Sequence, residues 1–206
     1  MKKLAVFASG RGSNFRKIYE NIQTGNIPAR VECLIADNPK ADVLEFASHE
    51  NIACYIIPPK NFSNAAEFGT ELLKILKQHS VDWIILAGYL KKIPDNVVKS
   101  FSNRIVNIHP ALLPSFGGKG MYGMHVHEAV FNSGAKVSGV TVHLVNENYD
   151  AGPIVLQTPV DISHCTNPHE IAENVLSVEH ELFSKAIKKL LTQSFEIRQN
   201  RVVFHS

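Results

Sequence analysis

Short apolar runs alternate with amphipathic segments along the first half of the chain, and this alternation constrains the fold more than any other feature. Five runs have the composition of buried strands: residues 4–9, 31–37, 53–58, 82–89 and 104–110. The segments between them, 13–25, 42–51, 63–80 and 94–101, have helical periodicity. Alternating strands and helices build a parallel sheet with helices on both faces. The sequence therefore predicts an α/β fold around an open, mostly parallel, twisted sheet.

The second half of the chain has a different pattern. Two β-rich runs, 137–146 and 153–162, are joined by the segment ENYDAG. The longest helical pattern covers residues 167–193, and residues 196–206 favour a small terminal hairpin or tail. Because we find no internal repeat, low-complexity segment or linker, we expect mixed C-terminal strands that extend one sheet in a single domain, residues 1–206.

Charge and cysteine content exclude several classes of function. Twenty-one Lys and Arg against 19 Asp and Glu leave a net charge of +2, too weak a field to favour nucleic acid or a membrane surface as the main partner. The three cysteines are scattered without a CxxC pair, which indicates neither a disulfide framework nor a zinc ribbon. The apolar run at the N-terminus is too short for a signal peptide, and no run approaches membrane-spanning length. We expect a protein of the reducing cytoplasm.

A glycine-rich turn, ASGRGSN, follows the first predicted strand. Its residues Gly10, Gly12, Ser13 and Asn14 suit a phosphate, because glycines let the backbone turn sharply and the amides at the start of the next helix attract an anion. A tight turn with a Ser or Asn helix cap explains the same residues equally well. A dinucleotide fingerprint with Asp37 as the ribose acid is disfavoured, since Phe15 occupies the third glycine position.

The last predicted strand of the first half, RIVNIHP, carries two polar residues. Side chains alternate along a strand, so Asn107 and His109 point to the same face, about 6 to 7 Å apart. In open sheets the carboxyl ends of the strands form the ligand crevice. Asn107 can donate to an oxygen that becomes negative in acyl transfer, and His109 can exchange a proton near neutral pH. The alternative is a core histidine and a strand-end asparagine bonded to nearby backbone.

A carboxylate that could orient the histidine occurs in the segment NENYDAGP. Asp150 is a natural partner, and a carboxylate near an imidazole is expected to raise the histidine pKa. Followed by Ala-Gly, Asp150 is equally typical of a turn. No GxSxG motif or evident Ser or Cys nucleophile occurs, so the chemistry indicated is direct transfer between two bound substrates.

The ten histidines raise the question of a metal. His125 and His127 are two apart at an expected helix start and point in different directions; His143 and His180 fall on a predicted strand and helix. No pair has ligand spacing supported by a third group, so we expect no metal and attribute most of the histidines to solvated helix faces.

Four motifs in this order and spacing, FASGRGSN, ILAGYLKKI, IVNIHPALLPSF and ENYDAGPIVLQ, carry a family resemblance over nearly the whole chain. They resemble the folate-dependent phosphoribosylglycinamide formyltransferase family, within the wider formyltransferases. The resemblance implies a Rossmann-like fold and transfer of a formyl group from 10-formyltetrahydrofolate to the amine of glycinamide ribonucleotide, the third step of purine biosynthesis. It divides the domain into a phosphate-binding half, 1–103, and a catalytic and folate-binding half, 104–206.

The resemblance also implies roles for particular residues. Asn107, His109 and Asp150 would be catalytic: Asn107 polarises the formyl oxygen, and His109 with Asp150 assists proton transfer. The ribonucleotide would be bound by Gly12, Ser13, Asn14 and Glu179, the last of which could equally be a solvated helix carboxylate. The folate co-substrate would lie against Leu90, Lys91, Lys92, Ile93, Asn107, Asn146, Glu147, Asn148, Tyr149 and Asp150.

Two features depart from the family pattern. Ala65 stands where many members carry an arginine that reaches the folate, and Lys60, Lys91 or Lys92 could substitute for it. The glycine-rich loop 115–123 is longer than the form we regard as typical. Its Lys119 could fold over a phosphate or the folate tail, whereas a mobile loop is the simpler expectation.

Other functions fit less well. Methionyl-tRNA formyltransferase and formyltetrahydrofolate hydrolase usually carry an extra domain, for which we expect no room beside strands that start at residue 4 and a core that ends near residue 193. A noncatalytic nucleotide-binding module would leave Asn107, His109 and Asp150 without a role. Small-molecule substrates and a monomer or homodimer are the expected partners and assembly.

Overall fold

The computed structural model describes residues 1–205, and their internal contacts fall into two units, Met1–Val106 and Asn107–Ser206. Strand β5 (Ile105–His109) contains the boundary between them.

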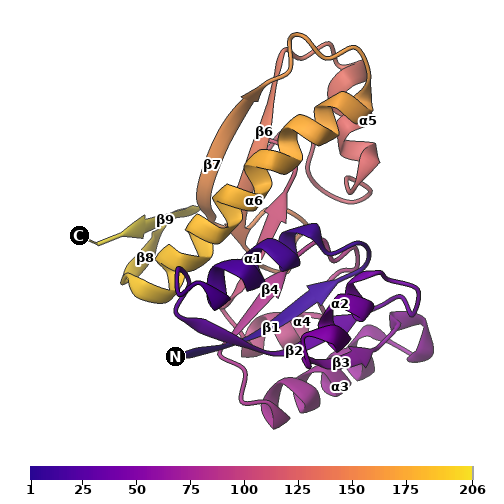
Figure 1. Ribbon diagram of the computed structural model, residues 1–206, viewed down its shortest axis with the longest axis vertical. Coiled ribbons are helices and arrows are strands. Elements are labelled where there is room, and N and C mark those ends of the chain that lie inside the picture. The colour runs from indigo at the N-terminus through magenta and orange to yellow at the C-terminus, as the bar shows by residue number, and fades with distance from the viewer. Residues whose placement is uncertain (206) are drawn as a thin grey trace. The chain divides into compact units, whose positions relative to one another are not determined.

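The first unit is built around parallel strands in the order β3-β2-β1-β4, with β5 next to β4. Its elements, shown in Figure 1, are β1 (Lys2–Ala8), α1 (Ser13–Gln23), β2 (Ala29–Ala36), α2 (Val43–His49), β3 (Ala53–Ile56), the 3₁₀ helix η1 (Pro59–Asn61), α3 (Ala65–Gln78), β4 (Trp83–Leu86) and α4 (Asp95–Ser100). The strands β3 and β4 end earlier than predicted, because Pro58 and the left-handed Gly88 follow them.

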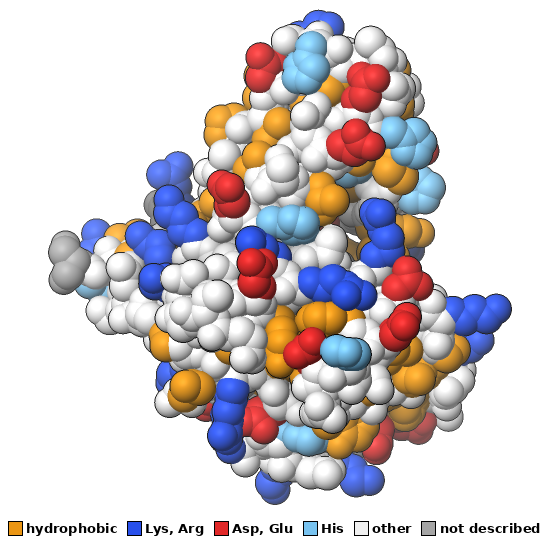
Figure 2. Space-filling model, viewed as in Figure 1, with side chains coloured by type: hydrophobic (Ala, Val, Ile, Leu, Met, Phe, Trp, Pro, Cys, Tyr) orange, Lys and Arg blue, Asp and Glu red, His pale blue; other side chains and the backbone are white. Residues whose placement is uncertain are grey.

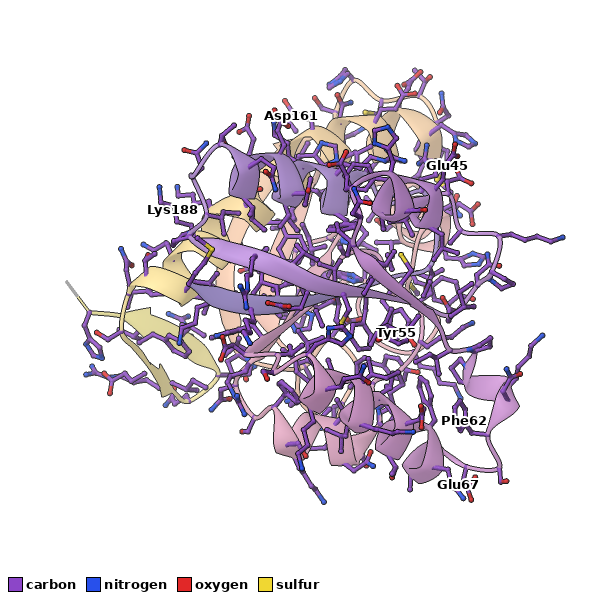
Figure 3. The ribbon with its side chains drawn as sticks, turned by 60° about the horizontal axis from the view of Figure 1, so that its bottom comes forward. Glu45, Tyr55, Phe62, Glu67, Asp161 and Lys188 are labelled. Atoms are coloured by element: carbon purple, nitrogen blue, oxygen red, sulfur yellow. The ribbon has the colours of Figure 1, made fainter. Side chains whose placement is uncertain are left out.

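The central strands of this unit are covered on both faces. Leu4 to Ala8 are fully buried, as expected of a parallel strand that has a helix layer on either side. Figure 3 shows Glu45 of α2 and Glu67 of α3 on opposite sides of the strands. The carboxyl ends of β1, β2 and β4 therefore leave the sheet between two helix layers, which is where ligands of open α/β sheets bind.

The second unit is built from mixed strands. It contains α5 (Met124–Asn132), β6 (Val137–Leu144), β7 (Ile154–Asp161), α6 (Pro168–Thr192), β8 (Phe195–Arg198) and β9 (Arg201–Phe204) (Figure 1). The strand order continues from β5 through β6, β7 and β9 to β8, with antiparallel pairs β6–β7 and β8–β9 and a parallel contact between β7 and β9. The long helix α6 packs on β6 and β7, and α5 packs beside it.

These elements confirm the predicted fold class, an α/β fold with an open, mostly parallel sheet and mixed C-terminal strands. The terminal hairpin is confirmed for β8 and β9, while Ser206 of the predicted segment lies outside the described residues. On the face shown in Figure 2, Lys and Arg side chains are interspersed with Asp and Glu. Among residues 1–205, no helix has both the length and the apolar composition needed to cross a membrane.

Candidate active site

The two polar residues of β5 lie in the second unit with their predicted neighbours. His109 is buried and Asn107 is half-buried, whereas Val106 and Ile108 are buried apolar residues. The Nδ1 atom of His109 lies 3.7 Å from Oδ2 of Asp150. The structure thus brings His109 and Asp150 together from segments about 40 residues apart in the sequence.

Asp150 is fixed by a tight turn between β6 and β7. Its φ is +51°, and a Cβ at Gly152 would overlap the carbonyl oxygen of Leu144. The amide of Gly118 donates to Asp150 Oδ2 at 2.9 Å. Burial alone would raise the pKa of Asp150, but His143 and His109 in their protonated forms and the Gly118 amide lower it below its usual value. Asp150 is therefore a carboxylate at neutral pH.

The pKa of His109 is lowered, whereas the sequence led us to expect that Asp150 would raise it. Burial of the imidazole lowers the pKa, and this outweighs the opposite effects of the Asp150 carboxylate and the Phe116 carbonyl. The net pKa is below 6.5, whereas the carboxylate alone would have raised it. A neutral imidazole that can accept a proton is the resting form near pH 7.

His143 of β6 is a site residue whose place the sequence did not reveal. Its Nε2 lies 3.1 Å from Asn107 Nδ2 and 3.6 Å from Asp150 Oδ1, and its Nδ1 lies 2.9 Å from the carbonyl oxygen of Leu144. Since the carbonyl can only accept, Nδ1 carries the hydrogen and Nε2 can accept from the Asn107 amide. His143 thereby fixes the side-chain amide of Asn107. The second N–H of that amide is available for a ligand.

The expectation that solvated helix faces explain most histidines does not hold for His127 of α5, and His143 lies on strand β6, as predicted. His143 and His127 are 2% and 6% exposed, whereas His125 of α5 is exposed, as the opposite directions of His125 and His127 predicted. Burial, followed by the charge of His109, lowers the pKa of His127 to about 4. Within residues 1–205, no group of three His, Cys, Asp or Glu side chains is arranged to hold a metal ion.

The other predicted site residues of the second unit, and the loop 115–123, differ in how far they are exposed to solvent. Glu179 of α6 is buried, contrary to the alternative of a solvated helix carboxylate. The loop after β6 has exposed residues Glu147, Asn148 and Tyr149 beside half-buried Asn146 and Asp150. In the loop 115–123, Phe116, Gly117 and Gly118 approach His109 and Asp150, while Lys119 is exposed.

The glycine-rich turn lies in the first unit between β1 and α1. Gly12 has φ +73° at the N-cap of α1, and a Cβ there would overlap Val43 at the start of α2. Ser13 and Asn14 follow in the first helical turn, and Asn14 is buried. The turn therefore has the left-handed glycine and helix start that the phosphate-site prediction requires.

A pocket of about 580 Å³ lies in the first unit and includes part of the predicted folate segment. Its walls are mainly apolar, and it is lined by Pro59, Phe62, Asn64, Ala65, Ala66, Phe68, Lys91, Lys92, Ile93, Pro94, Asp95 and Asn96. The rings of Phe62 and Phe68 lie 5.4 Å apart. Lys91 pairs with Asp37 at 3.6 Å and Lys92 with Asp95 at 3.1 Å. Leu90 is 44% exposed and lies outside this lining.

Comparisons with known proteins show the family to which the chain belongs. A family model described as formyl transferase matches residues 2–187. A chloroplastic phosphoribosylglycinamide formyltransferase from Arabidopsis thaliana is 43% identical over 202 residues, 98% of this chain and 69% of that protein. Phosphoribosylglycinamide formyltransferase from Bacillus subtilis is 38% identical over 93% of this chain and 95% of its own length.

Solved structures show the same relation. The crystal structure of glycinamide ribonucleotide transformylase 1 from Symbiobacterium toebii has a TM-score of 0.92 and 31% identity, covering 100% of this chain and 95% of that chain. That of the Geobacillus kaustophilus enzyme has a TM-score of 0.86 and 40% identity, covering 93% of this chain and 99% of that chain. This chain therefore belongs to the formyl transferase family.

Proposed function

We propose that this chain transfers the formyl group of 10-formyltetrahydrofolate to the amine of glycinamide ribonucleotide, the third step of purine biosynthesis. The observation that carries the proposal is the convergence of Asn107, His109 and Asp150 in the second unit, together with the formyl transferase match and the names of the relatives. An amide donor, a neutral imidazole and a carboxylate are the groups that acyl transfer to an amine requires.

The proposed step is a direct transfer through a tetrahedral intermediate. The substrate amine attacks the formyl carbon, and the free N–H of Asn107 donates to the oxygen as it becomes negative. The bond from the formyl carbon to the folate nitrogen then breaks. His109, with Asp150 beside Nδ1, takes the proton from the attacking nitrogen and returns it to the leaving folate nitrogen.

The first unit offers groups for binding both substrates. Gly12, Ser13 and Asn14 at the start of α1 would bind the ribose phosphate, and Glu179 of the second unit would bind the glycinamide end. The apolar pocket with Lys91, Lys92 and Ile93 would take part of the folate. We also assign Asn146 to Asp150 of the second unit to folate binding. The pocket has Ala65 at the arginine position, so Lys91 or Lys92 of its lining, or Lys60, would supply the cation for the folate tail.

We further infer that residues 1–206 act as one formyltransferase domain, with a phosphate-binding half at 1–103 and a catalytic and folate half at 104–206. Cytoplasmic action on small-molecule substrates, as a monomer or homodimer, fits the weak net charge and the absence of a membrane-spanning helix in residues 1–205.

The test is a formyl-transfer assay with 10-formyltetrahydrofolate and glycinamide ribonucleotide. Asn107→Ala, His109→Ala and Asp150→Ala should each lower kcat, and loss of the Asn107 donor should cost on the order of 10² to 10³ in rate. Full activity in all three folded variants would show that the roles are wrong. If formate is released from 10-formyltetrahydrofolate without the ribonucleotide, as fast as the folate is consumed in its presence, the protein would instead be a hydrolase.

A further inference from the structure

The loop residues Phe116 to Gly118 contact both members of the proposed proton-transfer pair. Nε2 of His109 lies 2.8 Å from the carbonyl oxygen of Phe116, and the amide of Gly118 donates to Oδ2 of Asp150 at 2.9 Å. That carboxylate oxygen is the one that faces His109 Nδ1 at 3.7 Å. One three-residue segment of backbone thus holds the imidazole on one side and the carboxylate on the other.

The local sequence Phe-Gly-Gly permits this close approach. Phe116 has φ +55° and Gly118 has φ +97°, both in the left-handed region. A Cβ at Gly117 would overlap Leu113 and would lie 3.3 Å from Asp150 Cβ. Because a phenylalanine seldom adopts a positive φ, the backbone conformation that aims its carbonyl at His109 is held against a local preference.

The hydrogen bond to Phe116 decides which nitrogen of His109 is basic. A carbonyl oxygen only accepts, so Nε2 must carry the hydrogen. The neutral imidazole then has its lone pair on Nδ1, which faces the Asp150 carboxylate at a distance too long for a direct hydrogen bond. A proton gained by His109 therefore sits on Nδ1, where the carboxylate attracts it.

We propose that the backbone carbonyl of Phe116 is a positioning group for the transfer reaction, which holds His109 as the Nε2–H tautomer and makes Nδ1 the nitrogen that exchanges the proton. The inference rests on the proposed function for its effect on rate, but its statement about the tautomer is independent of any substrate. His143 and His127 also lie near His109, so the readout must resolve the individual histidines.

The matched variants are Phe116→Val and Phe116→Gly. Valine is β-branched and strongly disfavours a positive φ, so it should move the carbonyl, whereas glycine adopts a positive φ freely and should keep it. Glycine removes more of the side chain than valine does. A loss confined to the valine variant therefore cannot come from lost packing of the phenyl ring.

The measurement is a two-bond ¹H–¹⁵N spectrum of ¹⁵N-histidine protein above pH 7, with the His109 signals assigned from the spectrum of His109→Gln. We expect the Nε2–H tautomer in wild type and in Phe116→Gly, and a mixture of tautomers in Phe116→Val. We expect kcat to fall about tenfold in Phe116→Val, the loss of roughly one hydrogen bond, with KM values unchanged.

Three results would overturn the proposal: an Nδ1–H tautomer in wild type, a wild-type tautomer in folded Phe116→Val, or equal losses of kcat in the two variants. The wild-type spectrum needs only His109→Gln for its assignment and no Phe116 variant, so it tests the tautomer even if Phe116→Val does not fold. If wild type shows the expected tautomer but no formyl transfer, the proposed function fails while the tautomer assignment stands.

Discussion

Three buried imidazoles, those of His109, His127 and His143, lie in the second unit with the carboxylate of Asp150. Burial rather than pairing sets the charge of His109 and His127. His109 and His127 have lowered pKa values because both rings are removed from water. Asp150 keeps its charge through the groups around it. A carboxylate beside the neutral imidazole of His109 suits a site that must accept a proton from an amine and release it within one turnover.

His127 should make the protein less stable in acid. Its pKa is about 4 in the folded protein and 6.5 for an unperturbed histidine, so the unfolded chain binds more protons between these values. Its contribution to the free energy of unfolding is therefore fully present above pH 6.5 and is lost as the pH falls toward 4, by about 3 kcal/mol. Urea unfolding of wild type and His127→Leu across this range measures the difference.

The control for that measurement is His125→Leu, which replaces an exposed imidazole on the same helix. We expect it to retain the wild-type dependence on pH. If the free energy of unfolding of His127→Leu falls with pH as steeply as that of wild type between pH 6.5 and 4, His127 is not a buried neutral histidine.

At the scale of elements, helices α3 and α6 both begin with an asparagine N-cap and a reciprocal glutamate hydrogen bond. Asn64 caps α3 by accepting from the Glu67 amide at 2.9 Å, and Asn167 caps α6 by accepting from the Glu170 amide at 3.1 Å. In both, the glutamate reaches back to the amide before the cap, Ser63 in one case and Thr166 in the other. These reciprocal bonds fix where each helix starts. In α6 the cap sets the register of the helix that carries Glu179.

Removing the cap of α6 should cost stability without changing the chemistry. Asn167→Ala is expected to lower the free energy of unfolding by about 1 kcal/mol, because the Glu170 amide loses its acceptor. Asn167→Ser keeps a side-chain acceptor for this amide without setting a second carboxylate against Glu170, and should remain closer to wild type. Urea midpoints of the three proteins measure the effect, and an unchanged midpoint in Asn167→Ala would contradict the role of the cap.

At the scale of the whole molecule, the proposed functions divide between the two units. The helix-start turn and the apolar pocket belong to Met1–Val106, whereas Asn107, His109, Asp150 and His143 belong to Asn107–Ser206. Binding of the ribose phosphate and catalysis of the transfer should therefore respond to different substitutions.

Ser13→Glu tests this division. A carboxylate at the start of α1 would repel the substrate phosphate, so KM for glycinamide ribonucleotide should rise at least about tenfold. KM for the folate and kcat at saturation should change little. Ser13→Ala, which adds no charge, is the control, and an unchanged ribonucleotide KM in Ser13→Glu would remove the phosphate from this turn.

The periodicity of the sequence was sufficient to predict the α/β alternation, the extra C-terminal strands and the shared face of Asn107 and His109. These depend on local patterns: apolar runs of strand length, helical spacing and the alternation of side chains along a strand. Strand ends were less predictable, since β3 and β4 stop before the apolar runs do.

Other properties depend on contacts between segments distant in the sequence. The sequence by itself determined that an asparagine, a histidine and a carboxylate were available for one site. Only the tertiary structure decided that β6 sets His143 against Asn107, that burial outweighs Asp150 in the pKa of His109, and that Phe116 bonds its Nε2. Desolvation and hydrogen-bond geometry arise from what surrounds a group in space, which no local pattern specifies.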